Sequence, residues 1–118
     1  MPHITSLNAL TLATRDLDRA VAFYSALGFA LVKSNADVGF ATFRVGGQHL
    51  NITAEQPAVD VRWWGRAIFY VDDVDAMYAR VKQAGFAPQS APRDAPWGER
   101  YFHLTDPDGH ELSFARPL

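Results

Sequence analysis

The feature that most restricts the fold is a helix-forming segment that occurs twice, 57 residues apart (16 to 73). In the first copy Asp16 precedes an apolar stripe with helical spacing, and Gly28 follows it. Asp is a favoured N-cap residue and Gly a favoured residue just beyond a helix C-terminus. Identical residues occupy both copies at Asp16/Asp73, Asp18/Asp75, Ala22/Ala79, Gly28/Gly85, Phe29/Phe86 and Ala30/Ala87. We therefore predict two tandem copies of one structural unit.

Each predicted helix follows one strand, at 7–14 and 66–71, and precedes about three more. The later strands are expected at 29–34, 39–45 and 48–53 in the first half and at 86–90, 100–105 and 110–115 in the second. Gly46-Gly47 and Asp106-Pro107-Asp108-Gly109 are typical turns. The predicted fold class is α+β: two tandem βαβββ modules that form a curved mixed sheet around a pocket. We expect one domain over 1–118, with modules at about 5–53 and 66–116 and a linker at 54–65.

Composition excludes several classes of function. The formal net charge of −2 and the scattered Lys and Arg residues argue against nucleic acid as a partner. The absence of cysteine excludes disulfides and thiolate chemistry. No apolar run is long enough to span a membrane, and the first residues do not resemble a signal peptide. We expect a cytoplasmic protein with no membrane partner.

Period-two alternation predicts which strand residues face away from the helices. In the first half this face should carry the more polar residues, among them His49 and Asn51. In the second half the expected residues are Arg66, Ile68, Tyr70, Tyr101, His103, Glu111, Ser113 and Ala115. If the two faces curl toward each other, these residues line one pocket.

Two stretches of this sequence resemble the vicinal oxygen chelate superfamily, which includes glyoxalase I, extradiol dioxygenases, fosfomycin-resistance enzymes and bleomycin-resistance proteins. The first stretch runs from Leu7 to Leu17 and continues with Ala20, Phe23-Tyr24 and Leu27-Gly28-Phe29. The second comprises Trp97-Gly98, Phe102, Asp106-Pro107-Asp108-Gly109-His110 and Leu112. The resemblance covers essentially the whole chain. It implies the predicted fold and, since two-module chains of this kind usually pair, a homodimer.

The resemblance also implies four metal-ligand positions, one on the first and one on the last strand of each module. Here they hold Ala9, Asn51, Arg66 and Ser113. None of these is a usual ligand of a catalytic divalent cation, and the fixed charge of Arg66 would repel one. We therefore expect no metal and no cofactor. The members that remain comparable are those that bind bulky ligands without a metal, as bleomycin-resistance proteins do.

Several residues leave two interpretations open. Arg66 would suit an anionic ligand group, or it could form an ion pair with Glu111 or Asp60. The loop residue Trp97, like Trp63 and Trp64, could line the ligand site or a dimer interface. Tyr70 and Tyr101 could donate hydrogen bonds to a ligand or fill the pocket.

Three functional hypotheses follow. The first is a metal-independent binder of a small, largely apolar ligand with an anionic group, contacted by Arg66, Asn51, His49, Tyr70, Tyr101, His103, Ser113, Glu111 and Trp97. The second is a superfamily enzyme that uses His49, His103 and Glu111 as an atypical metal or acid–base set. The third is a dimeric interaction protein whose pocket has filled in.

Overall fold

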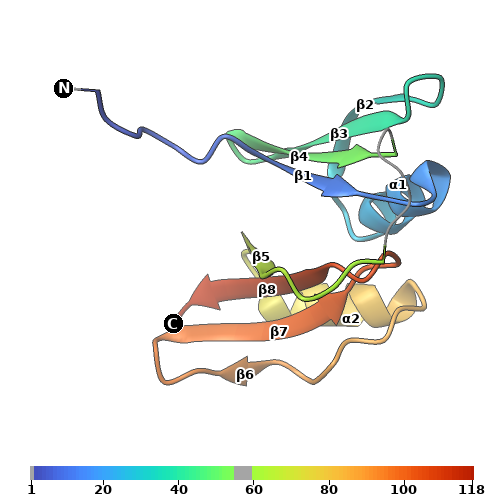
Figure 1. The fold of residues 1–118 in the computed structure, drawn as a ribbon. Coiled ribbons are helices and arrows are strands. Elements are labelled where there is room, and N and C mark those ends of the chain that lie inside the picture. Colours follow the sequence, from blue (N-terminus) through green and yellow to red (C-terminus); the bar gives the residue numbers. More distant parts are fainter. Residues whose placement is uncertain (1, 55–59) are drawn as a thin grey trace. The chain divides into compact units, whose positions relative to one another are not determined.

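The chain divides into two compact units, Met1–Val59 (unit 1) and Asp60–Leu118 (unit 2), in a computed structural model that describes residues 2–54 and 60–118. Each unit contains one helix and one four-stranded mixed sheet (Figure 1). The α+β class and the two βαβββ repeats are therefore confirmed, with two separate sheets rather than one. Part of the expected linker, residues 55–59, lies outside the described residues. The pocket enclosed by the two modules stays a prediction.

Unit 1 has the strand order β1-β4-β3-β2, in which β1 is parallel to β4 and the other pairs are antiparallel. Its elements are β1 (Ala9–Ala13), α1 (Leu17–Ala26), β2 (Ala30–Asn35), β3 (Phe40–Val45) and β4 (Gln48–Thr53). The five predicted elements agree with these bounds to within two residues at each end. Helix α1 contacts β3 and β4.

Unit 2 repeats this topology in the order β5-β8-β7-β6, with β5 parallel to β8. Its elements are β5 (Arg66–Tyr70), α2 (Val74–Gln83), β6 (Arg93–Asp94), β7 (Glu99–Thr105) and β8 (Glu111–Pro117). The strand predicted at 86–90 is wrong. That segment makes one backbone hydrogen bond to β7, from the N–H of Gln89 to the carbonyl of His103 (3.0 Å), and the paired strand is β6, inside the expected loop.

Both helices begin and end as the repeat predicts. The carboxylates of Asp16 and Asp73 accept hydrogen bonds from the backbone N–H groups of Arg19 (3.1 Å) and Ala76 (2.9 Å), as N-caps do. Gly28 and Gly85 lie one residue beyond the C-caps with φ of 98° and 91°, a region that favours glycine.

Each helix ends in a Schellman motif. The N–H of Gly28 donates to the carbonyl of Ser25 (3.0 Å), and the N–H of the next residue, Phe29, donates to that of Tyr24 (3.1 Å). Gly85 and Phe86 repeat both bonds in unit 2, to Lys82 (3.0 Å) and Val81 (3.1 Å). The two units therefore share their hydrogen-bonded ends as well as their sequence.

The core of each unit lies between its helix and one face of its sheet. In unit 1 the rings of Tyr24 and Phe43 are buried and lie 5.8 Å apart. In unit 2 the buried ring of Phe102 contacts Tyr78 of α2 (5.5 Å) and Phe114 of β8 (5.4 Å). No described helix is long and apolar enough to cross a membrane.

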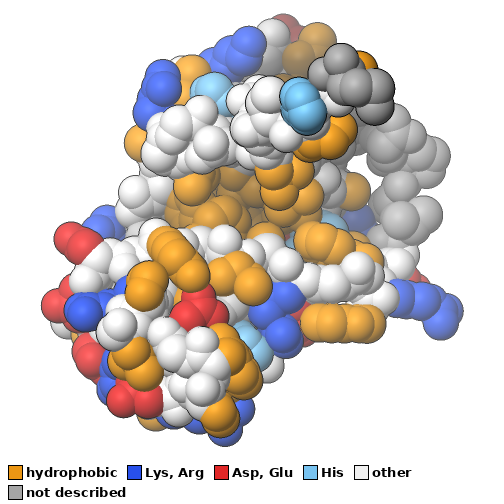
Figure 2. Space-filling model, turned by 90° about the vertical axis from the view of Figure 1, so that its left-hand side faces the viewer, with side chains coloured by type: hydrophobic (Ala, Val, Ile, Leu, Met, Phe, Trp, Pro, Cys, Tyr) orange, Lys and Arg blue, Asp and Glu red, His pale blue; other side chains and the backbone are white. Residues whose placement is uncertain are grey.

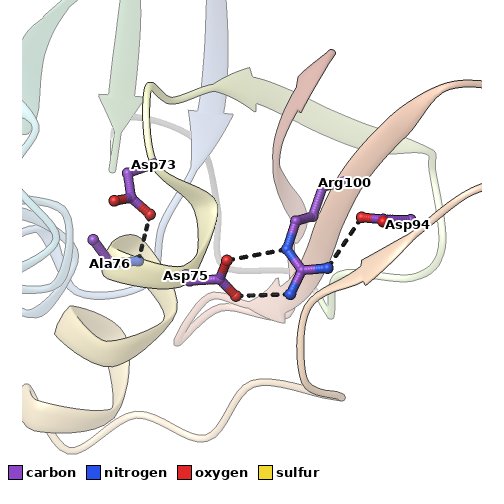
Figure 3. Close-up of polar contacts among 5 residues, drawn as sticks. All are labelled: Asp73, Asp75, Ala76, Asp94 and Arg100. Carbon is purple, nitrogen blue, oxygen red and sulfur yellow. Dashed lines mark hydrogen bonds and ion pairs between the residues drawn. The ribbon is translucent and has the colours of Figure 1, made fainter. Parts of the chain in front are cut away.

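Arg100 of β7 ties the first turn of α2 to the edge strand β6 (Figure 3). From β7 its Nε and one terminal nitrogen donate to the two carboxylate oxygens of Asp75, at 3.1 and 2.8 Å. Its other terminal nitrogen donates to Asp94 of β6 at 3.0 Å. These hydrogen bonds lower the pKa of Asp75 and raise that of Arg100. The two-residue strand β6 is thus held by a side chain as well as by its ladder.

We predict that Asp73→Ala lowers the free energy of unfolding by about 1 kcal/mol, because the N-cap hydrogen bond to Ala76 is lost. Urea unfolding followed by circular dichroism measures this change. Asp72→Ala is the matched control, since it removes an exposed carboxylate next to the cap without removing the cap bond. Equal losses in the two variants would contradict the cap assignment.

We also predict that Arg100→Gln raises the pKa of Asp75 toward its ordinary value of 3.8. Because the folded-state pKa lies below 3.8, the pair stabilises the folded state above that pH and the contribution is lost as pH falls. NMR titration of the Asp75 carboxyl carbon measures the shift. Arg116→Gln should move this pKa less, since Arg116 acts on Asp75 through space only.

Candidate functional site

The sheet surface of unit 2 that points away from α2, here called the open face, carries the predicted site residues of this unit. The ladder places Arg66, Glu111 and Thr105 in one row across β5, β8 and β7. The next rows are Ile68–Ser113–His103 and Tyr70–Ala115–Tyr101, and β6 adds Arg93 beside Tyr101. The predicted facing of these strands is therefore correct.

Small side chains on β8 separate larger ones on both flanks of the open face. Ser113 and Ala115 are only 3% and 1% exposed, although Ile68 and Tyr70 beside them are 60% and 63% exposed. Hydrophobic side chains are exposed among charged ones on the surface that Figure 2 shows. In unit 2 the described exposed large apolar residues are Trp63, Trp64, Ile68, Tyr70, Trp97 and Leu118.

Arg66 is incompletely satisfied on this face. Within residues 2–54 and 60–118 its buried Nε atom has no hydrogen-bond partner, and the carboxylate oxygen recorded beside it, Oε2 of Glu111, lies 4.0 Å from a terminal nitrogen. Its guanidinium carbon lies 5.0 Å from the ring centroid of Trp63, a cation–π arrangement. The ion pair with Glu111 that the sequence left open is therefore long.

The two carboxylates of the open face, Glu111 and Glu99, accept hydrogen bonds from uncharged side chains. Glu111 accepts hydrogen bonds from Gln89 Nε2 (2.6 Å) and from the hydroxyl of Thr105 (3.0 Å). Glu99 accepts from Trp97 Nε1 (2.9 Å) and from the hydroxyl of Tyr70, whose pKa this bond raises. Both acids are therefore held by groups that carry no positive charge.

A row of rings runs along β7 and ends beneath a second guanidinium. Trp97 lies 5.6 Å from Tyr101, which lies 4.9 Å from His103. Nε of Arg93 donates to the hydroxyl of Tyr101 (2.7 Å), and its guanidinium carbon lies 5.2 Å from that ring's centroid. The hydroxyl of Tyr101 thus already accepts one hydrogen bond within the protein. Whether it also donates to a ligand or only fills the pocket stays open.

His103 has a pKa below its ordinary value of 6.5. Burial is the main cause, and the positive charges of Arg66 and Arg93 lower it further, against the opposing charge of Glu111. The imidazole is therefore neutral at pH 7, and can offer one donor and one acceptor.

In unit 1 the corresponding sheet face carries uncharged polar contacts. The amide of Asn51 accepts from Thr42 Oγ1 (2.9 Å) and donates to Thr11 Oγ1 (3.3 Å), which forms a ladder across three strands. His49 lies in the same face, paired with Ala9 and Arg44. The amide oxygen of Asn51 is thus already an acceptor.

Trp64 and His110 pair with each other near the turn at 106–109. Trp64 Nε1 donates to Nδ1 of the buried His110 at 2.9 Å, so that this pair serves the structure of the turn region. Asp106 Oδ1 accepts the backbone N–H groups of Asp108 and His110, both at 2.9 Å. The predicted turn at 106–109 is confirmed.

Arg93, Glu99 and Gln89 also contribute to this surface, although the sequence pattern does not predict them there. Arg93 was placed in a loop because a strand of two residues has no readable alternation. Glu99 lies at the first position of β7, one residue before the predicted start. A cross-strand search for acids opposite Tyr70 could have found Glu99 only with the register known.

Comparison with known proteins places this chain in a family. Residues 3–114 match the Glyoxalase/Bleomycin resistance protein/Dioxygenase superfamily. The chain belongs to this superfamily. It is 30% identical over 105 residues to a bleomycin resistance protein of Klebsiella pneumoniae, covering 83% of this chain and 82% of that protein.

Two further superfamily members bear on function. The chain is 29% identical over 118 residues to the metallothiol transferase FosB of Lysinibacillus sphaericus, covering 94% of this chain and 82% of that protein. The crystal structure of a bleomycin-binding protein complexed with bleomycin is 27% identical with a TM-score of 0.76, covering 98% of this chain and all of that one.

The residues at the four ligand positions that the superfamily resemblance implies do not fit a divalent cation. Ala9 has no donor atom, and the oxygen of Asn51 already accepts a hydrogen bond. Arg66 places a permanent cation at its position, and Ser113 offers a neutral hydroxyl that is 3% exposed. Among residues 2–54 and 60–118 no group of three or more His, Asp or Glu side chains has metal-site geometry.

We predict that Arg66→Gln raises the pKa of His103, since one of the two positive charges that disfavour the imidazolium is removed. Glu111→Gln should lower it, because the opposing negative charge is lost. NMR titration of the His103 ring protons measures both shifts. The control is Arg80→Gln, which removes an exposed cation on α2, and a shift there as large as that in Arg66→Gln would contradict the assignment.

Proposed function

We propose that this superfamily member is a metal-independent binder of a small, largely apolar ligand that carries an anionic group. The observation that carries the proposal is the Arg66 guanidinium: among the described residues its buried Nε has no hydrogen-bond partner, and its recorded carboxylate neighbour lies 4.0 Å away. A buried polar hydrogen without an acceptor is costly, so a ligand oxygen that accepts it stabilises the complex. The ligand would contact residues of the open face.

The charge state around Arg66 favours an anion. Glu111 is the neighbouring acid, but Gln89 and Thr105 already donate to its oxygens. An incoming carboxylate, sulfonate or phosphate can therefore take two guanidinium N–H groups in a fork geometry without displacing a short ion pair.

The surroundings of Arg66 favour an apolar ligand body. Trp63 lies against the guanidinium, and Ile68 is 60% exposed on the next row of the sheet. Covering this apolar surface contributes roughly 25 cal/mol for each Å² removed from water. The exposed Tyr70 and Trp97 extend the aromatic surface in the same unit, whereas Tyr101 is buried.

The donor chemistry at the four inherited ligand positions supports binding without a metal. A protein that is 30% identical to this chain is named a bleomycin resistance protein, and a solved structure that is 27% identical is a bleomycin-binding protein complexed with bleomycin. These two names support small-molecule binding as the shared activity. The anionic group is proposed from Arg66 alone.

We predict that naphthalene-2-sulfonate binds about tenfold more tightly than its neutral analogue naphthalene-2-sulfonamide, because only the sulfonate pairs fully with Arg66. Arg66→Gln should remove this preference, whereas Arg80→Gln should keep it. Isothermal titration calorimetry measures the affinities of the three proteins for both probes, and tryptophan fluorescence gives a second signal. Equal affinities of the wild type for both probes would overturn the proposal, as would a preference unchanged in Arg66→Gln.

The alternative is a superfamily enzyme with an atypical metal or acid–base set, of which His103 and Glu111 lie in unit 2. It is favoured by the neutral His103 near Glu111 on one face, and by similarity to a metallothiol transferase. Elemental analysis of the purified protein, followed by dialysis against Zn²⁺, Mn²⁺ or Ni²⁺, separates the two. One tightly bound cation per chain that is lost in His103→Gln would favour the enzyme and contradict metal independence.

Homodimerisation and a cytoplasmic location stay predictions. Trp97 is 66% exposed although its indole is bonded to Glu99, so it could contact either a ligand or a second chain. Sedimentation velocity with and without naphthalene-2-sulfonate tests the dimer separately from ligand binding.

A further inference from the structure

The open face of unit 2 carries two guanidiniums, and the mechanism of anion binding above uses only one. Arg66 and Arg93 lie on the two outermost strands of the sheet, β5 and β6. Both are stacked on aromatic rings, of Trp63 and Tyr101 respectively. Neither has a carboxylate closer than 4.0 Å among the residues that the structure describes.

His103 lies between these guanidiniums on the face. In the strand register Arg66 is one row away on the side of Thr105, and Arg93 is one row away on the side of Tyr101. With strands about 4.8 Å apart and same-face residues about 6.7 Å apart, their Cα atoms lie about 12 Å and about 8 Å from that of His103. The two cations therefore approach His103 from opposite corners.

Between the two corners, the small residues of the middle strand are buried among larger side chains. Ser113 and Ala115 occupy the middle strand with small side chains, and the rings of Tyr101 and His103 flank them on β7. Ile68 stands on the other side in the same row as His103. A planar ring laid over Ser113 would contact apolar or aromatic side chains on both edges.

We propose that the open face of unit 2 binds a planar aromatic ligand with two anionic groups, one paired with Arg66 and the other with Arg93, so that the ligand spans His103. The inference rests on the proposed function and adds the number and placement of the anions. Two stacked guanidiniums without a close carboxylate match two anions, and a ligand with one anion leaves Arg93 with only its bond to Tyr101.

Two anions beside His103 have a second consequence. The groups that face His103 are Arg66 on β5, Glu111 on β8, Tyr101 on the same strand and Arg93 on β6. The two arginines now oppose protonation of the imidazole, and neutralising both reverses this effect. A disulfonate should therefore leave the pKa of His103 higher than the monosulfonate does, since both ligands bury the imidazole and only the disulfonate neutralises both arginines.

The test compares naphthalene-2-sulfonate with the 1,5-, 2,6- and 2,7-disulfonates by calorimetry. The wild type should bind at least one disulfonate about tenfold more tightly than the monosulfonate. Arg93→Gln should remove this gain, read as the ratio of disulfonate to monosulfonate affinity within each variant, whereas Arg93→Lys should keep part of it. Arg80→Gln is the control for net charge, and circular dichroism confirms that each variant is folded.

The outcomes separate the two proposals. Monosulfonate binding that depends on Arg66, with no gain for any disulfonate or no effect of Arg93→Gln, would overturn the two-anion inference and leave the proposed function standing. Loss of the preference for naphthalene-2-sulfonate over its sulfonamide would overturn the proposed function itself.

Proton uptake gives the independent readout. Sulfonates do not titrate near neutrality, so the buffer dependence of the binding enthalpy at about pH 6 reports protons taken up by the protein. We expect more proton uptake for the disulfonate than for the monosulfonate in the wild type, and no such difference in His103→Gln. Equal uptake for the two probes in the wild type, or an undiminished difference in His103→Gln, would overturn the placement of two anions beside His103.

Discussion

The packing of Phe102, Leu104 and Phe114 against α2 is the constraint on which the rest of unit 2 depends. Once these side chains are buried on one face of β7 and β8, alternation sends Tyr101, His103 and Ser113 to the other face. A one-residue slip would reverse the two sets. The chemistry of the open face is therefore a consequence of where the core lies.

The same constraint distributes the charges. Because Arg100 alternates with Tyr101, it points to the helix side, where it binds Asp75 and Asp94 in a network of short hydrogen bonds (Figure 3). Arg66 points to the open face, where the acid beside it is already bonded to Gln89 and Thr105. Two arginines of one sheet therefore differ. Arg100 donates hydrogen bonds to two carboxylates, whereas the Nε of Arg66 has no acceptor among the described residues.

Much of this arrangement could be predicted from the sequence. The capping residues Asp16 and Asp73 and the glycines Gly28 and Gly85 act within one helical turn, so their roles are readable locally. The facing of Arg66, His103 and Glu111 followed from alternation once the apolar partners were assigned. The false strand at 86–90 has the opposite origin, since its apolar residues suited a strand but only Gln89 found a bond on β7.

What the sequence by itself determined was the duplicated unit, the superfamily, and the replacement of the usual metal ligands by Ala9, Asn51, Arg66 and Ser113. Local periodicity and residue chemistry suffice for those conclusions. Only the tertiary structure decided that Arg93 belongs to the open face, that neutral donors hold Glu111 and Glu99, and that Arg66 keeps a buried N–H without an acceptor. These contacts join residues far apart in the chain, and strand pairing, which no local pattern encodes, brings them together.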